Sequence, residues 1–163
     1  MKPEDAQLKR VRLLTAVMIV GLVISGATAM PVVSELEALA LWYGVANVAD
    51  PESLSGMQRW IHDVWVGLKE TDGKYPFLLY GYDWLAFGHF VIALALVGAW
   101  RDPVRNVWLF EFGMIACVAV IPFALVAGHF RGIPLGWRMI DCLFGVIGFL
   151  PMWWARRMVG RIG

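Results

Sequence analysis

Cysteine, histidine and charged residues are scarce in this chain of 163 residues. It contains two cysteines and three histidines, and charged residues make up 17% of it, below the ~25% usual in soluble domains. Cys117 and Cys142 do not form a CxxC pair, which excludes a zinc ribbon or a dithiol redox motif, and both are expected to be buried thiols. A phosphate-binding glycine loop and a GxSxG nucleophile motif are also absent, so no motif names a reaction.

Four apolar stretches separated by charged joints dominate the rest of the sequence: 13–30, 84–100, 107–130 and 139–155. Each is about long enough, at ~1.5 Å per helical residue, to cross a hydrocarbon core of ~30 Å. Hydrophobic residues make up 60% of the chain, which leaves little room for a separate soluble domain. We therefore expect residues 1–163 to form a single integral membrane domain, an all-α protein built as a four-helix transmembrane bundle.

The segment 31–82, between the first two spans, is expected to be helical and to lie outside the membrane. Asp50-Pro51 is a favourable start for a helix that reaches about Thr71. Apolar side chains recur along it at steps of three and four residues, at Met57, Trp60, Ile61, Val64, Trp65 and Leu68. This pattern predicts an amphipathic helix, either an aromatic anchor on the outer membrane surface or a lid over the bundle.

A shorter helical pattern precedes it, from Glu35 to Tyr43, and Gly44 is expected to stop that helix. The whole segment contains several aromatic residues, which is not typical of a disordered linker.

Basic residues gather on one side of the predicted membrane. The two tails and the joint after the second span carry nine Lys or Arg against three acids, whereas 31–83 and 131–138 carry five against eight. The positive-inside rule then places both termini in the cytoplasm, and a bacterial inner membrane is the expected location. An alternative is that Ala27-Thr28-Ala29 ends a secretory signal peptide, so that residues 1–29 are removed and three spans remain.

Polar residues in or beside the spans are the candidate functional groups, because ionisable side chains are costly in lipid. With both termini inside, the outer half of the membrane holds several such residues, and Tyr82 lies near the same helical face as His89. Together with two tryptophans of the amphipathic helix they form the predicted ligand-binding set: His89, His129, Asp83, Arg138, Asp141, Trp60, Trp65 and Tyr82. Arg138 and Asp141, three residues apart, are expected to form an ion pair.

Two further expectations concern single residues. Glu111 is expected to lie near its helix start, close to Arg101 and Arg105. His89 has four open roles: a hydrogen bond to a neighbouring helix, proton transfer, contact with a ligand, or ligation of haem or a metal.

The cofactor stays unknown at this stage. A haem held by His89 and His129 is one alternative, and a zinc or copper site is another, from His62, Asp63, His89 and His129. None of these residues has a metal-site spacing such as HxxxH, so no metal ligand is assigned.

The predicted layout is one span, an outer segment of about fifty residues and three further spans, the last two of which contain prolines. This layout resembles that of the four-helix proteins of the sterol isomerase and sigma-2 receptor group. Those proteins place intramembrane acids and a histidine around an apolar ligand cavity. The resemblance lies in topology and in no contiguous motif, so it assigns no residue. It implies that such a bundle can enclose a hydrophobic ligand.

Two functions from different classes remain open. The first is an accessory or assembly subunit, or a binding protein, of a membrane complex, with partner membrane subunits or a second copy of the chain as its partners. The second is a protein or enzyme that binds an outer-leaflet lipid or apolar small molecule in a cavity lined by His, Asp and Arg. The lipid bilayer surrounds both. Nucleic acid is not an expected partner, because the arginines adjoin the membrane ends.

Overall fold

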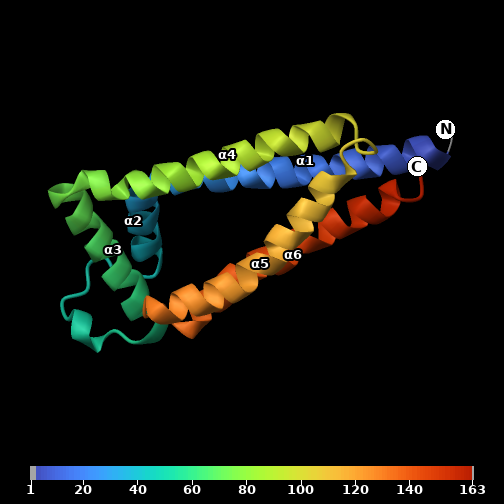
Figure 1. The fold of residues 1–163 in the computed structure, drawn as a ribbon. Coiled ribbons are helices and arrows are strands. Elements are labelled where there is room, and N and C mark those ends of the chain that lie inside the picture. Colours follow the sequence, from blue (N-terminus) through green and yellow to red (C-terminus); the bar gives the residue numbers. More distant parts are fainter. Residues whose placement is uncertain (1–2, 163) are drawn as a thin grey trace. The chain divides into compact units, whose positions relative to one another are not determined.

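The computed structural model describes residues 3–162, which are helical except for short joints (Figure 1). The α-helices are α1 (Pro3–Ala29), α2 (Val32–Trp42), α3 (Gly56–Lys74), α4 (Tyr80–Arg101), α5 (Val107–Phe130) and α6 (Leu135–Val159). Two 3-10 turns, η1 (Pro51–Ser53) and η2 (Pro76–Leu79), precede α3 and α4. No strand occurs among these residues.

Four stretches are long and apolar enough to cross a membrane: Glu4–Ala29, Pro76–Arg101, Val107–Phe130 and Leu135–Val159. In the most apolar part of each, only 17% to 22% of the residues are buried inside the protein. Most of their apolar side chains therefore face outward, where lipid would cover them at lower cost than water. This arrangement is compatible with an integral membrane protein.

The chain divides into two compact units. The central unit is Ile24–Phe90; the terminal unit contains the described residues up to Val23 and those from Val91 onward. The boundaries fall within α1 and α4, so each of these helices contributes one part to each unit.

Parts of four helices share the core of the terminal unit. Its buried residues are Val11 from α1, Leu96 and Ala99 from α4, Leu109 and Phe110 from α5, and Met152, Ala155 and Val159 from α6. Thr15 is also buried, and its hydroxyl donates to the Val11 carbonyl at 2.8 Å, so no polar atom of this side chain is left unpaired. Arg12 ties α1 to the end of α4 by donating to the Trp100 and Arg101 carbonyls, each at 3.2 Å.

Glycines allow α5 and α6 to pack closely along one another (Figure 1). A Cβ atom on Gly145 would collide with the Cys117 carbonyl oxygen, and one on Gly148 would lie 2.9 Å from the Cys117 Sγ. A Cβ on Gly113 would lie 2.9 Å from the Met152 sulfur. Gly113 of early α5 thus meets Met152 of late α6, and Gly128 of late α5 meets Arg138 of early α6, as in an antiparallel helical hairpin with a small-residue seam.

In the central unit, α2 and α3 pack around a small core of Ala40, Val45 and Ile61. Lys69 of α3 also forms an ion pair with Glu37 of α2, with 3.3 Å between nitrogen and oxygen. The predicted stop at Gly44 is confirmed: α2 ends at Trp42, and Gly44 adopts a φ of 71°, a left-handed conformation that glycine adopts without steric cost.

The predicted start of the following helix at Asp50-Pro51 is wrong. Asp50 accepts a hydrogen bond from the Glu52 N–H at 3.1 Å, but the turn that it caps is only η1. The backbone then becomes extended at Leu54 and Ser55, and α3 begins at Gly56, whose φ is 57°. The Asp50-Pro51 pair therefore starts one short turn, as a capping residue followed by proline does. Gly56 then allows the chain to change direction before α3 begins.

Candidate functional site

Arg138 does not form the predicted ion pair with Asp141. Its Nη1 donates instead to the Leu125 carbonyl of α5 at 3.1 Å, and its aliphatic part lies against Gly128. Because Gly128 has no side chain, the arginine lies across α5 rather than along its own helix. Its Nε is buried without a hydrogen-bond partner among the described residues.

Asp141 is half-buried in α6, six residues after the helix begins at Leu135. Within residues 3–162 no group donates a hydrogen bond to its carboxylate or pairs with it. Two neighbouring polar groups of α6, Asp141 and the Arg138 Nε, therefore lack partners among residues 3–162.

Glu111 and His129 occupy the two ends of α5. Glu111 accepts a hydrogen bond from the Arg156 Nε of α6 at 2.7 Å, so its partner is not Arg101 or Arg105 as expected. This pair joins α5 and α6 near the core of the terminal unit. His129 is exposed in the last turn of α5, with its ring edge-to-face against Phe130.

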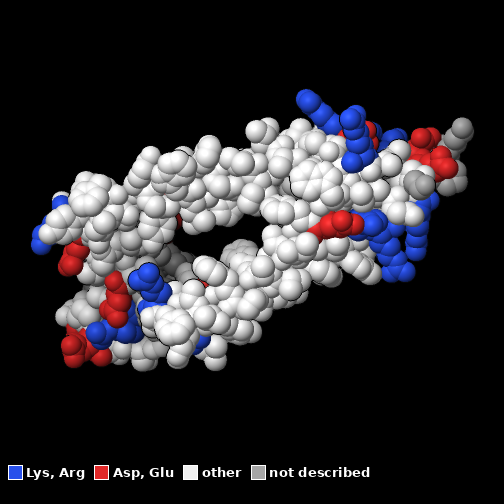
Figure 2. Space-filling view, in the orientation of Figure 1, with Lys and Arg blue, Asp and Glu red and all other residues white. Residues whose placement is uncertain are grey.

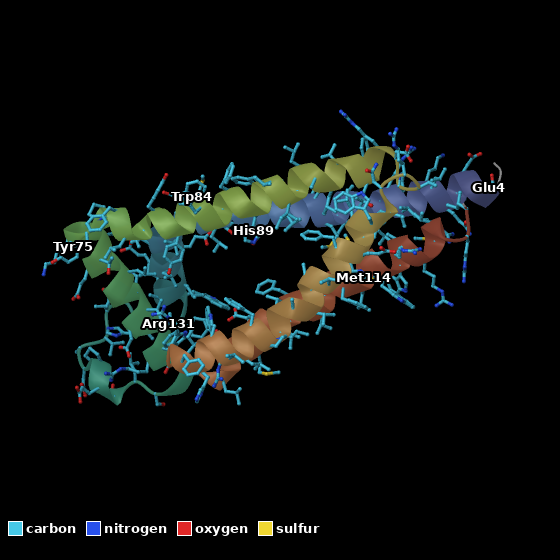
Figure 3. The ribbon with its side chains drawn as sticks, viewed as in Figure 1. Glu4, Tyr75, Trp84, His89, Met114 and Arg131 are labelled. Atoms are coloured by element: carbon cyan, nitrogen blue, oxygen red, sulfur yellow. The ribbon has the colours of Figure 1, made fainter. Side chains whose placement is uncertain are left out.

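His89 lies near the middle of α4 and is half-buried (Figure 3). Its Nδ1 is 2.7 Å from the Leu85 carbonyl oxygen, one turn earlier in the same helix. A carbonyl only accepts, so Nδ1 carries the proton, and the neutral ring then presents a lone pair on Nε2. Such a ring can accept a hydrogen bond or bind a metal through Nε2.

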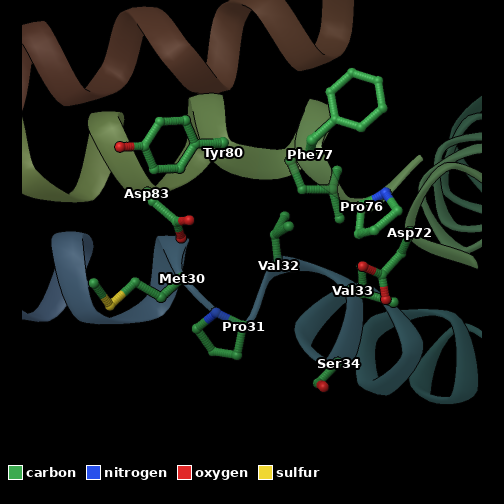
Figure 4. Close-up of a pocket in the computed structure, with 11 residues that line it drawn as sticks. Met30, Pro31, Val32, Val33, Ser34, Asp72, Pro76, Phe77, Tyr80 and Asp83 are labelled. Atoms are coloured by element: carbon green, nitrogen blue, oxygen red, sulfur yellow. The ribbon is translucent and has the colours of Figure 1, made fainter.

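Asp83 and Tyr82 lie in the first turn of the same helix, α4. Tyr82 is half-buried and Asp83 is exposed. Asp83 lines a cavity of about 570 Å³ in the central unit, between the end of α1, the start of α2 and the start of α4 (Figure 4). The other lining residues are Met30, Pro31, Val32, Val33, Ser34, Asp72, Pro76, Phe77, Leu79 and Tyr80.

The two predicted tryptophans lie on α3 and differ in environment. Trp65 packs against the core of α2 and α3, with its indole N–H buried and without an acceptor among the described residues. Lys69 lies 5.0 Å from the Trp65 ring centre, as in a cation–π contact. Trp60 is half-buried and does not belong to this core.

Asp63 of α3 interacts with two neighbouring side chains of the same helix. Its carboxylate accepts a hydrogen bond from the Arg59 Nε at 3.0 Å and lies 3.3 Å from the His62 Nδ1. Desolvation raises the pKa of Asp63, but the hydrogen bonds and charges of Arg59 and His62 outweigh it, so the pKa lies below its ordinary value. Asp63 is thus held in its ionised form on an exposed helix face.

The structure divides the predicted set between the two units. His89, Asp83, Tyr82, Trp60 and Trp65 belong to the central unit, and the remaining three residues to the terminal unit. Of the five predicted residues in the central unit, Asp83 alone lines the cavity near the start of α4. In the part of the chain that the structure describes, no three His, Cys, Asp or Glu side chains are grouped so that they could hold a metal ion.

The sequence interpretation missed a second cavity of about 580 Å³ in the terminal unit. It lies between the start of α1 and the end of α6, and its lining is Arg10, Leu13, Leu14, Trp154, Arg157, Met158 and Arg161. The spacing of Arg157, Met158 and Arg161, which places them on one helical face, is the signal that could have indicated it.

Comparisons of the chain with protein-family models, with curated proteins and with solved structures give no match.

Proposed function

We propose that this chain is an accessory or assembly subunit of a complex in a bacterial inner membrane. Its four long helices form one transmembrane bundle with both termini in the cytoplasm, and α2 and α3 lie outside. The apolar outer faces of the helices contact lipid and either a partner subunit or a second copy of the chain. The unpaired carboxylate of Asp141 is the observation that carries this proposal.

Asp141 lies about 9 Å along α6, at ~1.5 Å per residue, inside a stretch that is apolar enough to span a membrane. A carboxylate at the centre of a membrane helix costs ~2.5–3.5 kcal/mol on insertion scales and less toward the helix ends, and carboxylates within membrane helices are usually paired. Arg138, the nearest cation along the helix, already donates to the Leu125 carbonyl. A hydrogen-bond donor or cation from another chain would satisfy Asp141, and this supports an assembly role.

The first prediction tests Asp141 as an assembly contact. In a mild detergent the wild-type protein is expected to form a species larger than its 18.2 kDa monomer, measured by native mass spectrometry. Asp141→Leu removes the acceptor, and the loss of a hydrogen bond to a charged group should weaken association about tenfold or more. The substitution is compatible with the surrounding helix, because Leu suits both lipid and a helical conformation.

Glu70→Leu is the matched control, because Glu70 is an exposed acid on α3, outside the long apolar helices. It should leave the assembly unchanged. A monomeric wild-type protein, or an Asp141→Leu variant that assembles as well as the wild type, would contradict the proposal.

A second function is favoured by the cavity near the start of α4. Its volume of about 570 Å³ lies within the ~300–1,000 Å³ typical of small-molecule sites. Its lining combines apolar side chains with the carboxylates of Asp72 and Asp83, as Figure 4 shows. An apolar molecule or outer-leaflet lipid that co-purifies with the monomer would favour this binding or enzymatic role over assembly.

Retention of the first helix is part of the proposal. Val11 and Thr15 of α1 are fully buried in the terminal unit, and Met18 lies close to Gly148 of α6. Removal of residues 1–29 as a signal peptide would therefore expose part of this core. This supports an uncleaved first span.

A further inference from the structure

The cavity between the start of α1 and the end of α6 combines two kinds of surface. Leu13, Leu14, Trp154 and Met158 provide apolar walls, and Arg10, Arg157 and Arg161 complete the lining. Figure 2 shows Lys and Arg side chains gathered where α1 begins and α6 ends, beside a long region almost without charge. The groove thus lies at the border between charged and apolar surface.

The three arginines of the groove have no carboxylate partner among the described residues. Glu111 at this end of the terminal unit is already paired with Arg156. Asp102 accepts a hydrogen bond from the Arg105 backbone N–H and so caps its own turn. Glu4 and Asp5 precede Arg10 by six and five residues, which places them on other faces of a helix with 3.6 residues per turn. Within the described part of the chain, no carboxylate therefore compensates the positive charge of the groove.

Arg157 is held beside the apolar wall. Its guanidinium carbon lies 5.3 Å from the centre of the Trp153 ring, as in a cation–π contact. Trp153 and Trp154 stand at the end of α6, where aromatic side chains suit a membrane–water interface. The apolar wall continues along α1 to the exposed side chains of Val17 and Val20. A hydrocarbon chain bound in the groove could therefore extend along this apolar surface of α1.

We propose that this groove binds an anionic phospholipid, with the headgroup phosphodiester between Arg10, Arg157 and Arg161 and an acyl chain along Leu13 and Trp154. Planar guanidinium groups donate paired hydrogen bonds to phosphate oxygens. In a zwitterionic choline headgroup, the positive charge of the choline would offset the attraction between the arginines and the phosphate. Basic pockets between membrane helices recognise anionic headgroups in this way. The inference is independent of the proposed role of Asp141, which lies in the first two turns of α6.

The experiment compares two lipids that share acyl chains, phosphatidylglycerol and phosphatidylcholine, added to the purified full-length protein in mild detergent. Native mass spectrometry measures the lipid retained at each concentration. The wild type is expected to retain phosphatidylglycerol in preference to phosphatidylcholine. Arg157→Gln combined with Arg161→Gln should weaken phosphatidylglycerol binding about thirtyfold, from the contribution of each basic residue near an anionic surface, and leave phosphatidylcholine binding unchanged.

Arg105→Gln is the matched control, because Arg105 is an exposed arginine of the terminal unit outside the groove. It should leave phosphatidylglycerol binding unchanged. Leu13→Glu is a second variant for the case in which the double substitution unfolds. Leu13 is 65% exposed, so a carboxylate there keeps the core intact and should also weaken phosphatidylglycerol binding.

Equal retention of the two lipids by the wild type would overturn the proposal, as would an equal loss in Arg105→Gln. Soluble glycerol 3-phosphate provides the last comparison. If it displaces phosphatidylglycerol at equal concentration, the site recognises a free phosphate monoester rather than a lipid, and the proposal fails. If it does not, the apolar wall contributes to binding as proposed.

Discussion

Asp63 on α3 shows how neighbouring donors hold an exposed carboxylate in its charged form. Arg59 is one helical turn away, so its Nε reaches both carboxylate oxygens at 3.0 Å. The same arginine donates from Nη1 to the Pro51 carbonyl at 3.1 Å, which ties η1 to α3. One side chain therefore stabilises both the ionised Asp63 and the turn that precedes the helix.

We predict that Arg59→Gln raises the pKa of Asp63 toward its ordinary value. Because the folded-state pKa lies below the unfolded value, the pair contributes stability that is fully present above the ordinary pKa of Asp. This stability is lost as the pH falls from that value through the lower, folded pKa. The side chains are 41% and 50% exposed, so the contribution should be small, ~0.3–0.5 kcal/mol as for other i,i+4 pairs.

The carboxyl carbon shift of Asp63, followed by NMR during an acid titration, measures this pKa directly. Lys69→Gln is the control, because Lys69 pairs with Glu37 instead, and it should leave the Asp63 titration in place. An Asp63 midpoint that is the same in the wild type and Arg59→Gln would show that the guanidinium does not hold the charge.

Residues such as Arg138 show where prediction from the sequence stops. Its position in the span was predictable, because the apolar pattern fixes which residues fall within each helix. Its partner was not, because an arginine can contact either its own helix or the next one. Gly128 decides the outcome by leaving room on α5, and this facing of α5 and α6 is a property of their packing.

At the scale of elements, the hairpin of α5 and α6 depends on close contact along its glycines. Without water to drive apolar surfaces together, membrane helices associate through van der Waals packing and hydrogen bonds, for which small residues allow close approach. Gly145 faces the backbone of Cys117, whereas Gly113 faces the flexible end of Met152. A side chain at position 145 would therefore have to displace a helix backbone.

We predict that Gly145→Val destabilises the protein by about 1–3 kcal/mol, the usual cost of overpacking. Its Cβ would meet the Cys117 carbonyl oxygen and lie 2.7 Å from the Val120 side chain. Thermal unfolding in detergent, followed by circular dichroism, measures the effect. Gly21→Val is the control, since a Cβ at that position would have no atom within 4 Å apart from its neighbours in the chain and its own helix backbone, and its midpoint should stay near that of the wild type. Equal midpoints for the two variants would rule out a tight seam at Gly145.

The existence of the long helices was predictable from the sequence, but not their ends. Apolar runs predicted spans at 13–30 and 139–155, whereas α1 begins at Pro3 and α6 begins at Leu135. Glu4 and Asp5 in the first turn of α1 suit the positive end of the helix dipole, so the helix continues through polar residues. Hydropathy indicates which residues suit an apolar environment, whereas the helix can continue into polar residues on either side of the apolar stretch.

At the scale of the whole molecule, the distribution of Lys and Arg along the chain was predictable from the sequence, whereas their grouping in the groove was not. Lys and Arg gather in the terminal unit, where α1 begins and α6 ends (Figure 2). The sequence alone predicted this grouping, because the basic segments are the N-terminal tail, the joint after the second apolar stretch and the C-terminal tail. The grouping of Arg10 with Arg157 and Arg161 in one groove needed the folded structure, since Arg157 follows Arg10 by 147 positions in the chain.

The last prediction is the orientation of the proposed bundle. Positively charged loops are retained in the cytoplasm, so alkaline phosphatase fused after residue 163 should be inactive, and green fluorescent protein fused there should fluoresce. Alkaline phosphatase inserted at Gly73, on exposed α3, should be active, because that segment would lie outside. A variant with Arg156, Arg157 and Arg161 replaced by Gln tests whether the C-terminal charges help to set this orientation. An active C-terminal phosphatase in the wild-type chain would place the C-terminus outside and contradict the proposed orientation. Removal of residues 1–29 would not produce this result, because the three remaining spans would start outside and still end in the cytoplasm.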